Sequence, residues 1–473
     1  MLTYDLDRRG KLARYDYLYR CIREDILAGR LTAGEKLPSK RSLASHLQTA
    51  VITVQNAYAQ LEAEGYLYTR EKRGYYVADV ERHPAAPGRA PARSAPQPQR
   101  SWLLDLSSGS SGTEDFPFSV WAKLMRRVLS EEGEALLRAT PPNGADALRR
   151  AIAQHLYRFR GISAAPEQIV VGAGTEYLYN LIVQLLGREA VYGVEDPGYS
   201  KAARIYALGG ARTAPVLVDE GGVSLKPLEM SGAQILHTSP NHQFPTGAVT
   251  PIGRRQSLLR WAEAREGRYI IEDDYDSEFR FTLRPIPTLQ SIDRAGRVIY
   301  VNTFSRTLAP SLRISYMVLP KSLTEHYRAQ LGFYSSTVPA MEQHTLARFL
   351  DEGYFEAHIN RMRKSYRAQR DAVIDTILQS PLGEHCRVSG EDAGLHFLLT
   401  IDTKCTDHVL RADAEGRGVR LSFLSDFALR PGSAPQHTLV IHYPGIDLGR
   451  LRSALSILEA LLYFRDWKYK GRK

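Results

Sequence analysis

Apolar residues near the start of the chain recur three or four positions apart, the spacing of one face of an α-helix. In YDYLYRCIREDILAGRL, Leu18, Ile22 and Ile26 share such a face with Leu27, and Gly29 is expected to end the helix. Two further helical stretches, AGEKLPSKRSLASHL and TAVITVQNAYAQLEAEGYLYTR, follow with a short turn between them, and the basic hairpin EKRGYYV comes next. The order helix, turn, helix and hairpin predicts a winged helix-turn-helix module.

The pattern changes at RHPAAPGRAPARSAPQPQRS, which is rich in proline, alanine and arginine and predicts an extended linker at residues 82–101. Beyond it, apolar strand-like runs such as QIVVGAG, RYIIEDD and RVIYVNTF alternate with helical patterns, which predicts an α/β domain with a mostly parallel sheet. The last part begins with long helical periodicity and returns to short strands at HFLLTI and HTLVIHY. We expect a first domain at 1–81 and a second at 102–473, with a large subdomain at about 102–340 and a smaller α/β subdomain at about 341–473.

The chain has a formal net charge of +10, and the basic excess in its first 101 residues bears on the choice of partner. Residues 1–101 hold 17 lysines and arginines against 11 aspartates and glutamates, which favours a polyanionic partner for the first domain. No run approaches the roughly 20 apolar residues of a membrane span and the first residues lack a signal-peptide core, so we expect a cytoplasmic protein without membrane contact. Cys21, Cys386 and Cys405 have no disulfide or ligand spacing, which predicts packing roles and no metal site.

The segments LPSKRSLASHL and TVQNAYAQLEAEGYL resemble the signature of the GntR family of bacterial regulators. The resemblance implies binding to a double-stranded DNA operator, with phosphate contacts that position the module and polar side chains that read base edges. It assigns DNA contacts to the start of the second helix, to the third or recognition helix, and to the wing. The residues concerned are Ser39, Lys40, Arg41, Thr53, Val54, Gln55, Asn56, Lys72, Arg73 and Gly74.

One departure from this signature lies at the start of the recognition helix. The family's usual Ser-Arg pair is replaced by Ala50 and Val51, which removes one expected DNA contact and leaves the operator preference open. The alternative for the whole module is a three-helix unit that serves only for protein contacts.

Four segments of the second domain resemble the aminotransferase-like half of the MocR/GabR subfamily, in which a GntR-type domain is fused to a fold-type I pyridoxal 5'-phosphate (PLP) domain. The first segment, VVGAGTEYLYNLI, places Gly172 and Gly174 between a strand and a helix, where free backbone N–H groups and the helix dipole can hold a phosphate. The resemblance assigns Gly174, Thr175 and Glu176 to this phosphate cup. By itself, the Gly-x-Gly pattern is typical of an ordinary strand-to-helix turn.

The second and third segments supply aromatic side chains. In VEDPGYS, the resemblance places Tyr199 against the pyridine ring, since an aromatic face suits a flat π system. In SPNHQFPTG, Phe244 stands where aminotransferases have an asparagine, a feature of the MocR branch.

The fourth segment, YIIEDDYDSEFRF, runs from an apolar strand into carboxylates. The resemblance assigns Asp273 to the pyridinium nitrogen of PLP and Tyr275 to its phenolic oxygen. The strand that follows, with VNTFSRTLAPSLRISY, supplies Thr303, Ser305 and Arg313 as phosphate contacts. Taken alone, the acid cluster is also compatible with metal ligands or helix caps.

Arg306 occupies the position of the lysine that holds PLP covalently in the family. A guanidinium stays protonated and cannot form that bond. A second departure is Ala139, which stands at the position of a tyrosine that reaches the cofactor phosphate. Arg430 is a candidate for the substrate-carboxylate arginine by residue type only, and a solvated surface arginine is the competing interpretation.

The sequence therefore predicts a homodimeric transcription regulator of MocR type, with a winged helix-turn-helix and a fold-type I aminotransferase-like domain that senses a small effector such as PLP, an amino acid or an amine. The second domain is expected to be catalytically inactive. PLP is either bound noncovalently or lost in favour of another anionic ligand. The alternative is an active aminotransferase that uses another lysine, such as Lys201.

Overall fold

The structure is a computed structural model of the 473-residue chain, and it describes residues 2–80, 102–107, 115–281 and 286–463. The chain divides into two compact units, 1–99 and 100–473. The predicted linker at 82–101 lies outside the described residues.

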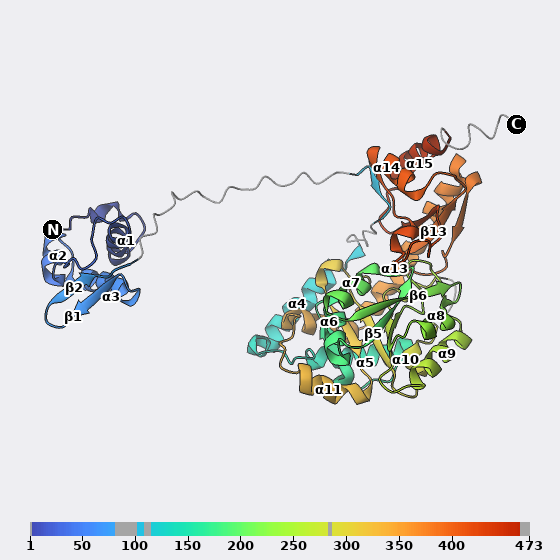
Figure 1. Ribbon diagram of the computed structural model, residues 1–473, viewed down its shortest axis with the longest axis horizontal. Coiled ribbons are helices and arrows are strands. Elements are labelled where there is room, and N and C mark those ends of the chain that lie inside the picture. The colour runs from blue at the N-terminus through green and yellow to red at the C-terminus, as the bar shows by residue number, and fades with distance from the viewer. Residues whose placement is uncertain (1, 81–101, 108–114, 282–285, 464–473) are drawn as a thin grey trace. The chain divides into compact units, whose positions relative to one another are not determined.

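The first unit is a three-helix module with a two-stranded hairpin (Figure 1). Leu18, Ile22 and Ile26 of the first helix pack with Val54 and Leu61 of the third in one apolar core. The hairpin strands are antiparallel. The elements are η1 (Leu6–Arg9), α1 (Arg14–Leu27), α2 (Lys40–His46), α3 (Val51–Ala63), β1 (Leu67–Arg70) and β2 (Gly74–Val77).

The end of α3 differs from the prediction, because the sequence pattern extends the third helical stretch as far as Arg70. The structure ends the helix at Ala63 and places Leu67–Arg70 in a strand. Gly65 has φ 81°, a left-handed conformation that terminates helices, and the residues after it pair with β2. The helical periodicity of this segment was therefore misleading beyond the glycine.

The N-terminus of α3 lacks a side-chain cap. Ala50 has the extended backbone of a cap residue, but its methyl group cannot accept a hydrogen bond. We expect Ala50→Ser to stabilise this helix by about 1 kcal/mol, which corresponds to roughly fivefold slower hydrogen exchange of its amides in the full chain. Ala50→Val, which also lacks an acceptor, is the control. Equal exchange in the serine and valine variants would contradict the prediction.

The second unit is built on an eight-stranded sheet with the order β4-β11-β10-β9-β8-β5-β6-β7. The strands from β10 through β9, β8 and β5 to β6 are each parallel to their neighbours. At the edges, β11 is antiparallel to β4 and β10, and β7 is antiparallel to β6. The strands are β4 (Ile169–Gly172), β5 (Val191–Asp196), β6 (Arg212–Asp219), β7 (Gly222–Val223), β8 (Ile235–Thr238), β9 (Tyr269–Asp273), β10 (Val298–Thr303) and β11 (Ser315–Val318).

Helices cover both faces of this sheet (Figure 1). Successive side chains of a strand point to opposite faces, so Ile271 packs with α6, α7 and α11 while Ile270 packs with α8, α9 and α10. The helices of this part are α4 (Phe118–Glu132), α5 (Asp146–Arg160), α6 (Thr175–Leu186), α7 (Ser200–Leu208), α8 (Leu225–Met230), α9 (Ile252–Glu263), α10 (Leu289–Ile292) and α11 (Lys321–Leu331), with 3-10 turns η3 (Gly133–Leu137), η4 (Pro166–Gln168) and η5 (Pro310–Leu312).

The C-terminal part carries a separate antiparallel sheet with the order β12-β13-β15. A short strand directly after the predicted linker, β3 (Leu104–Asp105), pairs with β14 of this part. The elements are α12 (Ala340–Asp351), α13 (Tyr354–Leu378), η6 (Pro381–His385), β12 (Cys386–Ser389), β13 (His396–Ile401), α14 (Asp407–Gly416), β14 (Val419–Arg420), η7 (Leu424–Phe427), β15 (Thr438–His442) and α15 (Leu448–Leu462). Over the described ranges, no helix is long and apolar enough to cross a bilayer.

Candidate functional site

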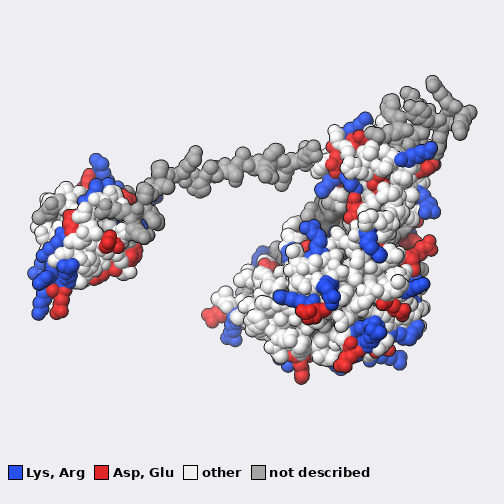
Figure 2. Space-filling model, in the orientation of Figure 1, with Lys and Arg blue, Asp and Glu red and all other residues white. Residues whose placement is uncertain are grey.

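The first unit presents the polar residues of its second and third helices and of its hairpin to solvent. Gln55 and Asn56 are exposed on α3, whereas Val54 lies in the core and its side chain is not available for a contact. Lys72 and Arg73 are exposed in the turn between β1 and β2. Figure 2 shows lysine and arginine side chains gathered over the hairpin and α2. This surface suits a polyanion.

The start of α2 adds to the same set of predicted contacts. Ser39 is the cap residue, and its Oγ accepts a hydrogen bond from the Ser42 backbone N–H at 3.2 Å. Lys40 and Arg41 follow in the first turn of the helix. The cap bond uses one lone pair of the Ser39 oxygen and leaves its hydroxyl proton free to donate to a phosphate oxygen.

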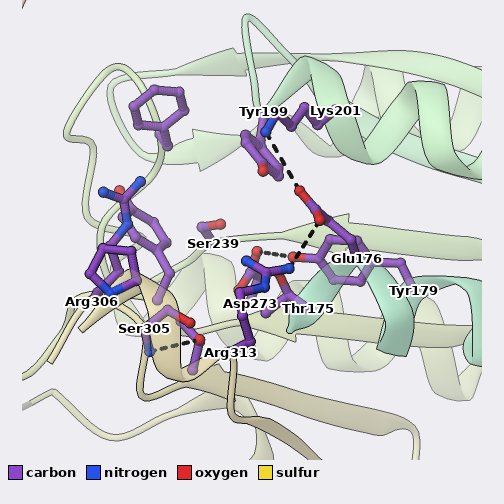
Figure 3. Close-up of a pocket in the computed structure, with 14 residues that line it drawn as sticks. Thr175, Glu176, Tyr179, Tyr199, Lys201, Ser239, Asp273, Ser305, Arg306 and Arg313 are labelled. Carbon is purple, nitrogen blue, oxygen red and sulfur yellow. Dashed lines mark hydrogen bonds and ion pairs between the residues drawn. The ribbon is translucent and has the colours of Figure 1, made fainter. Parts of the chain in front are cut away.

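A cavity of about 340 Å³ opens in the second unit where parallel strands of the large sheet end (Figure 3). Asp273 is the last residue of β9, Thr303 is the last residue of β10, and Ser239 follows β8. Ligands bind at such strand ends in open α/β sheets. The cavity is lined by Thr175, Glu176, Tyr179, Tyr199, Lys201, Ser239, Phe244, Asp273, Tyr275, Thr303, Ser305, Arg306, Pro310 and Arg313.

Asp273 is held from behind by a buried chain of polar side chains. The Tyr179 hydroxyl donates to Asp273 Oδ2 at 2.6 Å, His237 Nε2 lies 3.4 Å from the same oxygen, and the Tyr206 hydroxyl lies 2.6 Å from His237 Nδ1. Burial and the neighbouring Asp273 carboxylate hold the pKa of Tyr179 far above its usual value, so its hydroxyl stays a donor. Asp273 Oδ1 is buried and has no hydrogen-bond partner among the described residues.

The predicted phosphate cup brings opposite charges together. Gly174 has φ 95°, a backbone conformation that favours glycine, and a Cβ at this position would lie 2.2 Å from Arg313 Nη2, so the guanidinium would have to move. Arg313 Nη2 donates to Glu176 Oε2 at 3.0 Å, and Lys201 Nζ lies 3.5 Å from Glu176 Oε1 (Figure 3). A phosphate at this cup would meet Glu176 unless its side chain turned away.

The loop after β10 offers hydroxyl groups beside the cup. Thr303 Oγ1 accepts from the Ser305 backbone N–H at 3.1 Å and bonds Ser315 Oγ at 2.8 Å. The Ser305 Oγ is buried and has no partner in the part of the chain that the structure describes. A buried hydroxyl without a partner is costly, and an acceptor in the cavity would relieve that cost.

Three aromatic rings, those of Tyr199, Phe244 and Tyr275, line the cavity. Phe244 lies edge-on to Tyr199 and to Tyr275, with ring centroids 6.3 Å apart in both pairs. Burial raises the pKa of Tyr199 to about 12, although Arg306 and Arg313 oppose this. Burial also raises the pKa of Tyr275 well above its usual value. Both phenols are therefore neutral donors at physiological pH.

The Tyr275 oxygen is fixed by a buried histidine. His242 Nδ1 lies 2.9 Å from Asp276 Oδ2 and 3.1 Å from the Tyr275 hydroxyl oxygen. Because a carboxylate only accepts, Nδ1 carries the proton and the Tyr275 oxygen is a second acceptor. The Tyr275 proton is then free to point into the cavity.

Arg306 lines the cavity and is half-buried. It makes no hydrogen bond and no ion pair with another described residue. Its charge reaches two histidines on the small sheet, His396 and His442, which are paired across β13 and β15. Burial lowers the pKa of His442 to about 4, and Arg306 contributes to this shift in the same direction.

This shift makes the second unit less stable in acid. The unfolded histidine binds a proton as the pH falls below about 6.5, whereas the folded His442 resists protonation down to about pH 4. We expect this residue to contribute a loss of about 3 kcal/mol in the free energy of unfolding across that window. When the free energy of unfolding is measured with urea across this pH range, the His442→Gln variant should no longer show this loss. The control variant His408→Gln, at an exposed histidine, should still show it. The same pH dependence in all three chains would contradict the prediction.

Two residues singled out by the sequence lie elsewhere. Ala139 is exposed and is not among the described residues that line the cavity. Arg430 is half-exposed, but it is not simply a solvated arginine, because its Nε donates to the buried Asp196 Oδ2 at 2.9 Å. That pairing is its structural role.

The sequence pattern did not predict two residues that line the cavity, Tyr179 and Ser239. Tyr179 follows Thr175 by one helical turn, and Ser239 begins the SPNHQFPTG segment, so both positions could have been found from their neighbours.

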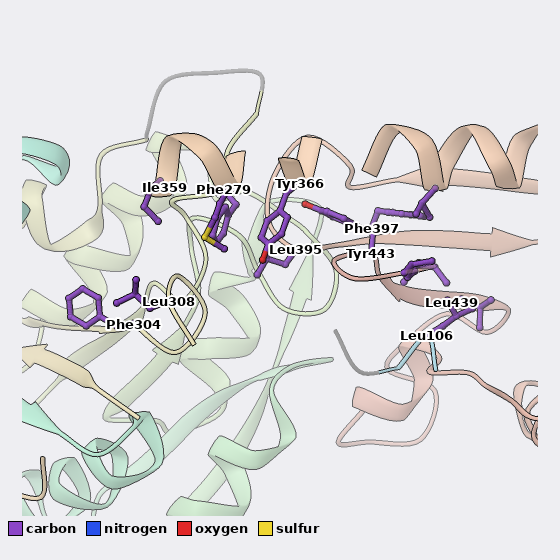
Figure 4. Close-up of a cluster of buried hydrophobic side chains, with 14 of the residues drawn as sticks. Leu106, Phe279, Phe304, Leu308, Ile359, Tyr366, Leu395, Phe397, Leu439 and Tyr443 are labelled. Atoms are coloured by element: carbon purple, nitrogen blue, oxygen red, sulfur yellow. The ribbon is translucent and has the colours of Figure 1, made fainter. Parts of the chain in front are cut away.

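One apolar core contains side chains from both the large and the small part of the second unit (Figure 4). It contains Phe304 and Leu308 from the loop after β10, Tyr366 from α13, and Phe397 and Leu439 from the small sheet. The loop that carries Arg306 is therefore packed into the same core as the small sheet.

Comparison with known proteins places both units. A profile described as "Bacterial regulatory proteins, gntR family" matches residues 14–77, and one described as "Aminotransferase class I and II" matches residues 102–410. The chain belongs to the GntR family, in the group whose members also carry an aminotransferase class I and II domain. The prediction of a winged helix-turn-helix joined to a fold-type I aminotransferase-like domain is confirmed.

Its relatives of similar length are regulators. The HTH-type transcriptional regulator YdeL of Bacillus subtilis is 37% identical over 97% of this chain and 99% of its own length. The "probable rhizopine catabolism regulatory protein MocR" of Rhizobium meliloti is 34% identical over 96% and 95%. The HTH-type pyridoxine biosynthesis transcriptional regulator PdxR of Corynebacterium glutamicum is 33% identical over 92% and 93%. The prediction of a MocR-type transcription regulator is thereby confirmed.

Solved structures match the second unit of this GntR-family protein. The α-aminoadipate aminotransferase LysN of Thermus thermophilus superimposes with a TM-score of 0.66 at 26% identity, over 76% of this chain and 92% of that one. The kynurenine aminotransferase of Pyrococcus horikoshii superimposes with a TM-score of 0.67 at 22% identity, over 77% and 92%. The second match shows the fold alone.

Proposed function

We propose that this GntR-family regulator binds its operator as a homodimer and uses the aminotransferase-like domain as a sensor rather than as an enzyme. The observation that carries the proposal is the cavity itself. It has polar groups that suit PLP, and it is lined by Arg306, which the sequence resemblance assigns to the position of the family's reactive lysine. In the proposed arrangement residues 1–81 bind DNA and residues 82–101 link them to the sensor domain. Residues 102–340 form the large subdomain, whose side chains line the cavity, and residues 341–473 form the small subdomain.

The residues present fit PLP in three respects. Asp273 Oδ1 is a buried acceptor without a partner, which suits a protonated ring nitrogen. Ser305 Oγ is an unpartnered donor, and Gly174 leaves the space that Arg313 fills. In this proposal Asp273 holds the pyridinium nitrogen and Tyr275 the phenolic oxygen. The remaining contacts belong to Gly174, Thr175, Glu176, Thr303, Ser305 and Arg313 at the phosphate and to Tyr199 at the ring.

Arg306 changes what the cofactor can do. When bound, PLP supplies an electron-poor ring and an aldehyde that reacts with amines. A guanidinium stays protonated, so it neither bonds to the aldehyde nor moves a proton as a lysine amine does. Arg306 instead adds a fixed positive charge without an ion partner among the described residues. This charge suits a carboxylate or phosphate on the ligand.

The ion pairs of Glu176 support a second ligand class for the same cavity. Arg313 and Lys201 are both engaged by this carboxylate, which weakens the cup for a dianion. An anionic ligand other than PLP would use Arg306 and leave the Glu176 pairs intact. In either case the effector acts only to the extent that it binds one arrangement of the two subdomains more tightly than the other.

Absorption titration with PLP, followed by borohydride reduction and mass spectrometry of the intact chain, tests the proposal. We expect saturable binding without a mass increase, or no binding if the cavity serves another anion. A reduced adduct on the unsubstituted chain would contradict it and would revive the aminotransferase alternative. Lys201→Arg then identifies the residue responsible, because Lys201 is the lysine that lines the cavity within the described ranges.

A further inference from the structure

The recognition helix begins with two exposed apolar side chains. Val51 and Ile52 are the first residues of α3 and are 43% and 58% exposed. The opposite face of the helix is already filled, since Val54, Ala57 and Leu61 are completely buried. β-branched residues are also poor helix formers, so neither folding nor solvation accounts for them at these positions.

The other exposed residues of the first two turns are polar but uncharged. Gln55 lies one turn after Val51, and Asn56 lies one turn after Ile52, so the four side chains form one continuous strip. The helix from Val51 to Leu61 contains no lysine and no arginine. It therefore lacks the side chains that most often read guanine, while glutamine and asparagine are suited to adenine.

The cations of this unit lie on the elements beside α3 rather than on this strip. Lys40 and Arg41 stand at the start of α2, and Lys72 and Arg73 stand in the hairpin turn. Lys40 Nζ lies 5.7 Å from the ring centroid of Tyr75 in β2, so the two sets of cations belong to one surface. Cations on the neighbouring elements suit a phosphate backbone and leave α3 for the base edges. An exposed apolar strip on that helix fits the thymine methyl group, which is the apolar group displayed in the major groove of DNA.

We infer that Val51 and Ile52 contact thymine C5-methyl groups, and that α3 reads A·T base pairs together with Gln55 and Asn56. The inference rests on the proposed function, since it requires α3 to enter the major groove. It assigns a specificity role to Val51, one of the two positions where the family's usual Ser-Arg pair is lost, and to its neighbour Ile52.

The test begins with selection of operators from a random duplex pool by the full chain. Each thymine of the selected operator is then replaced singly by uracil, which removes only the methyl group. Binding should weaken roughly fourfold at one or two positions of each half-site, as expected for burial of one methyl group. Ile52→Ala or Val51→Ala should weaken binding to the thymine operator and abolish the uracil penalty at its own position.

Ile252→Ala is the matched control, because Ile252 is also an isoleucine at the start of a helix and is 56% exposed. It should leave the uracil penalties unchanged. Equal affinity for thymine and uracil at every position would overturn the inference while leaving DNA binding established. Selection of half-sites that contain only G·C pairs would also overturn the inference and leave DNA binding established. If no duplex is selected, the proposed function itself fails and the inference with it.

Discussion

Replacing Arg306 by lysine should turn a cavity without covalent cofactor into one that retains PLP through borohydride reduction. The neighbouring groups stay in place in this variant, including Asp273, Tyr275 and Ser305. A lysine amine forms the bond that a guanidinium cannot form, so the change should be close to all-or-none. The measurement is the intact mass after reduction with saturating PLP.

Arg313→Lys is the control for this experiment. It also adds a lysine to the cavity, but at a residue that is paired with Glu176 rather than at the position of Arg306. We expect no adduct there. An adduct in the unsubstituted chain, or the same yield in both lysine variants, would show that position 306 is not what separates this protein from an aminotransferase.

The second large effect concerns the wing. Replacing both Lys72 and Arg73 by alanine should weaken operator binding roughly 60-fold at 0.1 M salt for each wing that contacts the DNA, because each lost phosphate contact removes about 0.9 from the slope of log affinity against log salt. The slope itself should therefore fall by about 1.8 per wing. Loss of affinity with an unchanged slope would mean that these side chains do not meet phosphates.

The exposed residues Lys226 and Arg265 of the second unit provide the control. Their double replacement by alanine removes the same formal charge from the chain. Both the affinity and its salt dependence should stay as they are in the unsubstituted protein. A comparable loss in this control would point to net charge rather than to the wing.

Much of the fold was predictable because short stretches of sequence determine it. A helical spacing of apolar residues predicts the buried face of α1 with Leu18, Ile22 and Ile26, and a continuous apolar run predicts β9. The end of α3 was not predictable in this way, because apolar spacing continues past Gly65 while the chain turns into β1. A hairpin partner decides the conformation there.

The cavity was predictable through residue types at strand ends, but its charge balance was not. Glu176 and Arg313 are 137 positions apart, and their ion pair depends on how β11 brings the loop before it beside α6. The same holds for Arg430, whose partner Asp196 lies on another element. Pairings of this kind follow from the topology of the sheet rather than from any local pattern.

The most direct test of a sensor role is the affinity of the full chain for its selected operator, measured with and without saturating PLP and amino acids. If the second domain is a sensor, at least one of these ligands changes the affinity by roughly fivefold or more. Asp273→Ala should remove the PLP response without changing the affinity of the ligand-free protein. An operator affinity that stays constant while the cavity is demonstrably filled would contradict the claim that this domain is a sensor.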